Sequence, residues 1–184
     1  SVNGEDESLD TILPIVKKYG AAVVGLTLDS KGIPESPCGR FAIAEKIVNT
    51  GAVYGVDKKD IIIDPLAMSV SADDKSALIT LEAVALIKQH LGVKTSLGVS
   101  NISYGLPNRN LINSAFFVMA MQKGLDAAII NPFSVEMMGA YHSYIALSGY
   151  DKNFLNYISF ADGDKNAAVD VNDSNCTDLK TSII

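Results

Sequence analysis

Four apolar stretches of the chain each end on a side chain that could hold a ligand through hydrogen bonds: Asp29, Asp64, Asn101 and Asn131. A carboxylate can accept two neighbouring N–H donors at once, and an amide can both donate and accept hydrogen bonds. Asp and Asn are also common in turns and at helix N-caps, and this structural interpretation stays open at all four positions. It is weaker for Asp64 and Asn101, which are predicted to lie deeper in their strands.

Predicted strands and helices alternate along the chain and would position these side chains. The strands are expected at 21–29, 61–66, 93–101 and 127–131, and the helices at 6–19, 40–54, 74–91, 110–123 and 134–147. Each strand is apolar throughout, which is typical of a parallel sheet covered by helices. This α/β pattern fits a doubly wound sheet or a (β/α)8 barrel. In either architecture the carboxyl ends of the strands share one rim, where active sites lie.

The composition excludes several classes of function. The chain has 184 residues, 48% of them hydrophobic, and a formal net charge of −6. The acidic balance disfavours nucleic acid and anionic membranes as partners, and no apolar run approaches the roughly 18 residues of a membrane span. No GxGxxG follows the first strand, which counts against a dinucleotide site. Cys38 and Cys176 lack the spacing of a metal site, so we expect reduced thiols, no bound metal and a cytoplasmic protein.

The chain is predicted to divide into a folded domain, 1–158, and a polar linker or loosely ordered tail, 159–184. Residues 162–173 are similar to the beginning of a calcium-binding loop. Ala167 stands where that loop needs glycine, and Asp173 stands where it needs glutamate, so calcium is disfavoured.

Three segments in combination carry a family resemblance: IIIDPLAMSVS at 61–71, LGVSNISYGLPNRNLIN at 97–113 and GLDAAIINP at 124–132. They resemble the pterin-binding domain of cobalamin-dependent methionine synthases. The methyltetrahydrofolate:corrinoid/iron–sulfur protein methyltransferases are close relatives, and all belong to the dihydropteroate-synthase-like barrels. The resemblance runs from Ser1 to about Tyr157.

The opening residues, SVNGE, are similar to the family segment that ends barrel strand four. The resemblance therefore implies the C-terminal half, about strands five to eight, of a (β/α)8 TIM barrel. In this family the other half supplies further pterin-binding groups, which have no counterpart in this sequence.

The implied reaction moves the N5-methyl group of 5-methyltetrahydrofolate, the substrate, to cob(I)alamin, as in methionine synthesis. By resemblance, Asp64 accepts hydrogen bonds from the pterin edge, and Asn101 is the catalytic residue that hydrogen-bonds N5 as the methyl departs. Arg109 would stack on the pterin or meet an anionic group, although it could also be a surface arginine at a helix start. Ser103 and Asn131 are weaker candidates that would support the pterin site.

The resemblance leaves the partners open. The cobalamin would be supplied by another domain or protein, and the alternative methyl acceptor is a corrinoid/iron–sulfur protein. Dihydropteroate synthase chemistry handles a pyrophosphate, and GLDAAIINP offers no basic residue for it. A non-enzyme alternative is a catalytically silent half-barrel that self-associates, because a four-stranded parallel sheet has unpaired edges. A homodimer of half-barrels would cover these edges.

Overall fold

The structure is built on a four-stranded parallel sheet whose strands lie in the order β1-β2-β3-β4. The computed structural model describes residues 1–163. The strands are β1 (Val23–Leu26), β2 (Ile61–Asp64), β3 (Lys94–Gly98) and β4 (Ala127–Ile129). Val2 adds a parallel bridge to Gly25 on the other edge of β1. Within residues 1–163 the order follows the sequence without a reversal, so these four strands contain no switch point of the kind found in a doubly wound fold.

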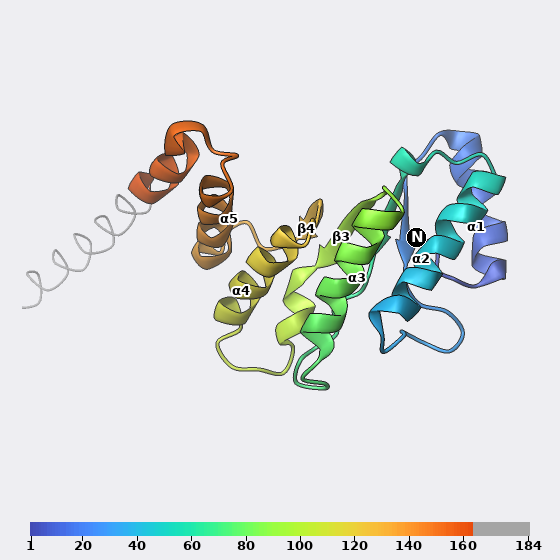
Figure 1. Cartoon of the computed structure of the whole chain (residues 1–184), viewed down its shortest axis with the longest axis horizontal. Coiled ribbons are helices and arrows are strands. Elements are labelled where there is room, and N and C mark those ends of the chain that lie inside the picture. The colour runs from blue at the N-terminus through green and yellow to red at the C-terminus, as the bar shows by residue number, and fades with distance from the viewer. Residues whose placement is uncertain (164–184) are drawn as a thin grey trace, which may run out of the picture.

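Helices cover one face of this sheet. The helices on this face are α1 (Asp6–Tyr19), α2 (Pro37–Val53), α3 (Ser76–His90) and α4 (Arg109–Gln122). The next helix, α5 (Val135–Leu147), packs against α4, and the short 3₁₀ helices are η1 (Lys58–Asp60), η2 (Val99–Ser103) and η3 (Lys152–Phe154). In Figure 1, α2, α3 and α4 lie side by side along the sheet. Ile61 and Ile63 of β2 are buried beneath them, whereas Ile62 and Asp64 on the other face are only half-buried. The predicted α/β fold with parallel strands is confirmed.

Local sequence explains where the helices begin and end. In α1, Leu9, Leu13 and Val16 recur at helical spacing and are buried, and Gly20 ends the helix in the left-handed conformation, with φ 59°. At the start of α2, the Ser36 hydroxyl accepts a hydrogen bond from the Gly39 amide at 3.1 Å, as an N-cap should. The core beneath the helices consists of two apolar clusters, one around α1, α2, β1 and β2 and one around α3, α4 and β3.

The strands are shorter than the sequence predicts, and this changes the surroundings of one candidate residue. The predicted strand 93–101 is wrong in its last part, because β3 ends at Gly98 and η2 follows. Val99 and Ile102 are both buried. Their spacing of three suits a 3₁₀ turn, in which residues three apart point the same way. Asn101 therefore lies on this turn and not in a strand.

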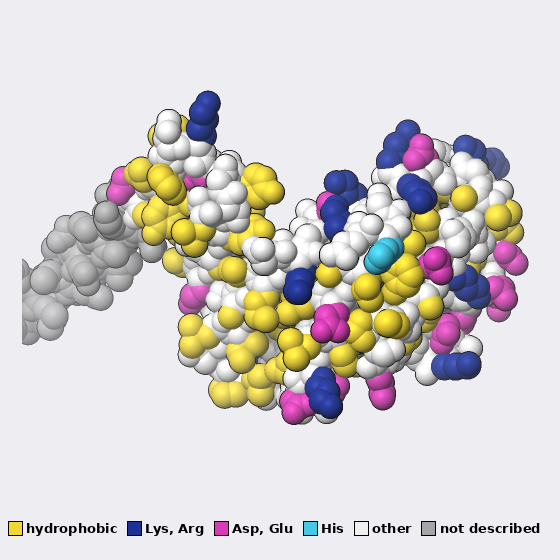
Figure 2. All heavy atoms as spheres, in the orientation of Figure 1, with side chains coloured by type: hydrophobic (Ala, Val, Ile, Leu, Met, Phe, Trp, Pro, Cys, Tyr) yellow, Lys and Arg dark blue, Asp and Glu magenta, His cyan; other side chains and the backbone are white. Residues whose placement is uncertain are grey.

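The C-terminal part of the described chain is only partly buried. Among the residues of α5, only Met137 is buried. Figure 2 shows apolar side chains gathered on this part of the surface. Residues 155–163 are helical, so regular structure continues past position 159, where the tail is predicted to begin. The remainder of that tail, with most of the calcium-like segment 162–173, lies outside the described residues. Within residues 1–163, no helix is long and apolar enough to cross a membrane.

Candidate functional site

The carboxyl edge of the sheet carries most of the residues that the sequence singles out. Asp64 is the last residue of β2, Asn101 lies three residues after β3, and Asn131 follows β4. Because β2, β3 and β4 are neighbours in the sheet, the three follow adjacent strands at one edge. Asp29 differs, because it lies beyond β1 in a tight turn, where it pairs with Gly32 and accepts a hydrogen bond from the Lys31 amide at 2.8 Å.

Asp64 is a half-buried carboxylate on the face of the sheet that the helices leave uncovered. Its Oδ1 accepts a hydrogen bond from the Leu66 amide at 2.8 Å. Burial raises the pKa of Asp64, and the hydrogen bond from Leu66 and the charge of Arg40 oppose that rise only in part. No other hydrogen bond to this carboxylate occurs within residues 1–163. Within these residues the second oxygen therefore keeps its full capacity to accept hydrogen bonds.

Arg40, which sequence reasoning missed, is buried beside the loop after β2 and is only 2% exposed. Its Nη1 lies within hydrogen-bond distance of the Pro65 and Leu66 carbonyls and of the Thr80 hydroxyl. Its Nε donates to the Pro34 carbonyl at 3.0 Å. Burial lowers the pKa of Arg40, and Asp64 opposes that shift. Arginine remains charged even so.

The Asn101 amide is exposed and makes no hydrogen bond to the described part of the chain. It lies against Gly98, where an added methyl group would come within 3.3 Å of Nδ2. Glycine at the end of β3 thus leaves the space that the amide occupies. An exposed amide with both its donor and its acceptor groups available is able to hydrogen-bond a ligand.

Ser103 and Arg109 form one unit next to Asn101. The Ser103 hydroxyl is fully buried and accepts a hydrogen bond from Nε of Arg109 at 2.9 Å. Nη2 of Arg109 donates to the Ser100 carbonyl at 2.7 Å, and the guanidinium lies 5.9 Å from the centre of the Tyr104 ring. Arg109 is the first residue of α4 and remains exposed. Ser103 therefore holds Arg109 and does not itself face solvent.

Asn131 has a local structural contact of its own. Its Oδ1 accepts a hydrogen bond from the Phe133 amide at 3.0 Å, which is the contact of a turn residue. The side chain is exposed at the end of β4. The interpretation as a turn residue is therefore stronger for Asn131 than for Asn101, whose side chain makes no such contact with the described residues.

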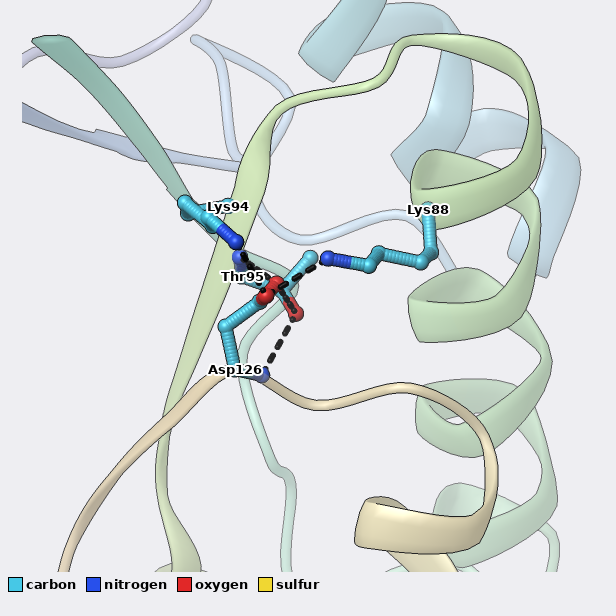
Figure 3. A network of polar contacts seen from close by, with 4 residues as sticks. All are labelled: Lys88, Lys94, Thr95 and Asp126. Carbon is cyan, nitrogen blue, oxygen red and sulfur yellow. Dashed lines mark hydrogen bonds and ion pairs between the residues drawn. The ribbon is translucent and has the colours of Figure 1, made fainter. Parts of the chain in front are cut away.

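The opposite, amino edge of the sheet carries a charged network that sequence reasoning also missed (Figure 3). Asp126, just before β4, accepts hydrogen bonds from Lys88 at 2.5 Å and from Lys94 at 3.0 Å. Its other oxygen accepts from the Thr95 amide at 3.0 Å. Burial raises the pKa of Asp126, but these hydrogen bonds outweigh it and the net pKa is lowered. The network joins α3, β3 and β4 at the end remote from Asp64, where a role in stability is expected.

Neither histidine of the chain lies at the carboxyl edge. His90 ends α3 with its ring edge-on to Phe41, and His142 in α5 stacks on Phe160 at 4.7 Å between ring centres. Within residues 1–163, no group of three or more His, Cys, Asp or Glu residues is arranged to hold a metal ion.

The sequence of this chain matches a known protein family. Residues 1–131 match the family described as pterin binding enzyme. The chain belongs to this family. The pterin-binding match covers β1, β2, β3 and β4 together with the rim residues Asp64, Asn101 and Arg109.

The relatives of this chain include one protein named as a methyltransferase and two named as methionine synthases. The chain is 32% identical over 155 residues to the methylcorrinoid:tetrahydrofolate methyltransferase of Eubacterium limosum, covering 83% of this chain and 57% of the relative. It is 36% identical over 138 residues to the methionine synthase of Mycobacterium tuberculosis, covering 70% of this chain and 12% of that protein. For the methionine synthase of Mycobacterium leprae the identity is 35% over 137 residues, covering 70% of this chain and 11% of that protein. The chain thus spans little more than half the length of the first relative and about a tenth of the other two.

Proposed function

We propose that the chain is part of a cobalamin-dependent methyltransferase of the methionine synthase type, which binds 5-methyltetrahydrofolate and transfers its N5-methyl group. The observation that carries the proposal is the carboxyl edge of the sheet. There a half-buried carboxylate at Asp64 and an unpaired amide at Asn101 follow neighbouring strands, in a chain that matches pterin-binding enzymes. Membership of the family and the names of the relatives support a folate substrate.

Each residue then has a distinct task. Asp64 accepts hydrogen bonds from the N–H groups of the pterin edge, for which an ionised carboxylate is well suited. Asn101 hydrogen-bonds N5, and this bond strengthens as charge on N5 changes during methyl departure, so it favours the transition state over the bound substrate. Arg109, held by Ser103, offers a planar cation to the pterin ring or to an anionic group of the substrate. Asn131 shapes the turn after β4 at the margin of this site.

The methyl acceptor is a separate matter. A corrinoid would supply the nucleophile that takes the methyl group, but the residues of the rim do not include a histidine that could ligate its cobalt, since His90 and His142 pack elsewhere. We therefore assign the cobalamin to another domain or protein. The Eubacterium limosum relative, whose name pairs methylcorrinoid with tetrahydrofolate, supports the alternative in which that partner is a separate corrinoid protein.

The uncovered face of the sheet supports our proposal that the chain is one half of a (β/α)8 barrel, and by resemblance this half would be about strands five to eight. Helices cover the face that carries Leu97, while Ser96 on the other face is half-buried and Ile129 is 70% exposed. Both faces of a parallel sheet are normally covered. The cover would come from the other half of the barrel, or from a second copy of the chain if the half-barrel is a silent fragment that self-associates.

The test is calorimetric titration of the complete protein that contains this chain with 5-methyltetrahydrofolate. We expect Asp64→Asn to weaken binding by about tenfold or more, because a charge-assisted hydrogen-bond acceptor is lost. The matched control is Asp57→Asn, which changes an exposed carboxylate in a similar turn just before the same strand. Equal affinity of the Asp64 and Asp57 variants, or no binding by the wild type, would refute the proposal.

A further inference from the structure

We propose that Arg40 is the positioning residue for Asp64, through the two carbonyls that follow Asp64 in the chain. The inference deepens the proposed function and rests on it only for the claim that Asp64 meets the pterin. Arg40 is not at the sheet rim itself, because it lies in the first turn of α2 and reaches the loop after β2 from the side.

The contacts of Arg40 converge on one short segment. Nη1 lies 3.0 Å from the Pro65 carbonyl and 2.5 Å from the Leu66 carbonyl, which belong to consecutive residues. The same atom lies 3.0 Å from the Thr80 hydroxyl, and that hydroxyl is 3.2 Å from the Leu66 carbonyl. The Arg40 guanidinium on α2 therefore contacts both carbonyls. Thr80 on α3 contacts both the guanidinium and the Leu66 carbonyl.

This arrangement stabilises a backbone conformation that leucine rarely adopts. Leu66 has φ 64°, in the left-handed region that favours glycine. Such conformations persist where surrounding contacts determine them, and they concentrate at functional sites. The hydrogen bonds to the Leu66 carbonyl are the contacts that hold this residue.

The conformation of Leu66 in turn decides how Asp64 lies. The Leu66 amide donates to Oδ1 of Asp64 at 2.8 Å, so the direction of that N–H determines which oxygen is engaged and which is left for a ligand. Pro65, between them, keeps Asp64 extended. The path from Arg40 to the carboxylate thus runs through two carbonyls and one amide, all within three residues.

Arg40 also acts through its charge. Burial raises the pKa of Asp64, and the positive charge of Arg40 works in the opposite direction. A carboxylate that accepts pterin hydrogen bonds must be ionised, so binding is lost as the pH falls through the pKa of Asp64. Without the cation, that loss should begin at a higher pH.

Two variants separate positioning from simple support of the fold. Arg40→Met removes the charge and all the donors, whereas Arg40→Lys keeps the charge but loses the Nε donor to the Pro34 carbonyl and the rigid planar geometry that directs Nη1 at the two loop carbonyls. The matched control is Ser36→Ala, which removes the N-cap of α2 and weakens the same helix end without touching the loop after β2.

The measurement that does not depend on folate is an NMR titration of the Asp64 carboxyl carbon, together with the chemical shift of the Leu66 amide, in the complete protein. We expect Arg40→Met to raise the pKa of Asp64 and to shift the Leu66 amide. Arg40→Lys should shift the amide with a smaller change of pKa, and Ser36→Ala should change neither. An unchanged pKa and an unchanged amide in both Arg40 variants would overturn the inference. Should Arg40→Met fail to fold, the amide shift of Arg40→Lys alone decides.

The second measurement is the affinity for 5-methyltetrahydrofolate as a function of pH. Arg40→Met should bind about tenfold more weakly at neutral pH, with the acid loss of binding moved to higher pH. A weakening that is equal at every pH would show a merely structural role and overturn the positioning one. If Asp64→Asn binds as the wild type does, the proposed function fails in its use of Asp64, while the NMR titration still decides the link between Arg40 and Asp64.

Discussion

The hydroxyl of Ser71 donates a hydrogen bond to the backbone carbonyl of Tyr104 at 2.8 Å. Ser69 donates to the same carbonyl at 2.6 Å, and the Val70 amide binds the Ile102 carbonyl at 3.0 Å. The loop that follows Asp64 is therefore tied to the loop that carries Asn101. Gly105 has φ 82°, and a methyl group on it would lie 3.1 Å from the Ser71 hydroxyl, so glycine permits the close approach of the two loops.

Loss of the hydrogen bonds from Ser69 and Ser71 to the Tyr104 carbonyl should impair substrate binding more than folding. The double variant Ser69→Ala/Ser71→Ala is expected to bind 5-methyltetrahydrofolate about tenfold more weakly. Without the two hydroxyls, the loops no longer fix the position of Asp64 relative to Asn101. Either single variant should show a small effect, since the remaining hydroxyl keeps the carbonyl occupied. Calorimetric titration and thermal unfolding measure the two effects. A large fall of the melting temperature without a specific loss of affinity would contradict this expectation.

The ionised Asp64 carboxylate should destabilise the folded protein at neutral pH. Its pKa is raised by burial, so between its unfolded and folded pKa the native state binds more protons, and stability falls as the pH rises through that interval. Asp64→Asn keeps an oxygen for the Leu66 amide and removes the buried charge. We expect its melting temperature to exceed that of the wild type at pH 7 and the difference to shrink towards pH 4. Equal melting curves at all pH values would contradict this.

Gly98→Ala should act on Asn101 alone. The added methyl group would lie 3.3 Å from Nδ2 of Asn101, and Gly98 has φ −76°, which alanine adopts without strain. We expect a normally folded protein whose methyl transfer is slower by about tenfold or more, because a small displacement of a catalytic group is costly. Gly139→Ala is the control, since its methyl group would meet Phe160 at 3.6 Å, an ordinary contact. Equal turnover in the two variants would show that Asn101 is not displaced or not catalytic.

Asp126→Asn should destabilise the protein without changing the site. The variant loses charge-assisted hydrogen bonds from Lys88 and Lys94, and a loss of about 1–3 kcal/mol in the free energy of unfolding is expected at pH 7. Because the folded pKa of Asp126 is lowered, its contribution is present above the unfolded value and is lost as the pH falls through the folded one. Urea unfolding at pH 7 and at acid pH measures this.

A surface pair is the control for that experiment. Asp6 lies 2.7 Å from Lys46, but its side chain is 81% exposed, so Asp6→Asn should change the unfolding midpoint little. If Asp6→Asn proved as destabilising as Asp126→Asn, burial and multiple hydrogen bonds would not explain the stabilising effect of Asp126.

Much of the fold was predictable because each βα unit repeats the same local pattern. The helix expected at 6–19 is the observed α1, since its apolar spacing and terminal Gly20 act within the helix itself. The strand expected at 93–101 runs too far because an apolar residue such as Val99 suits a buried 3₁₀ turn as well as a strand. Sequence pattern reports that such residues are buried, but not the backbone conformation that buries them.

The candidate site was predictable from the sequence to a lesser degree. Asp64 could be singled out from an apolar run that ends in Asp-Pro, and Asn101 from the glycine and proline that follow it. Arg40 could not, because its partners Pro65 and Leu66 lie 25 and 26 residues further along the chain, and no spacing rule joins them. The hydrogen bonds of Ser69 and Ser71 to Tyr104 are equally non-local.

The sequential strand order also bears on how the chain folds. Strands β2, β3 and β4 each pair with the strand before them in the sequence, and α2, α3 and α4 each connect two strands that are neighbours in the sheet. Contacts are therefore largely confined to adjacent βα units, much as in repeat proteins, in which folding can begin in one place and propagate. A nascent chain can add β2 to β1, then β3 to β2, as each unit leaves the ribosome. The loop after Asp64 would therefore lack its hydrogen bonds to the Tyr104 carbonyl until the next βα unit had been synthesised.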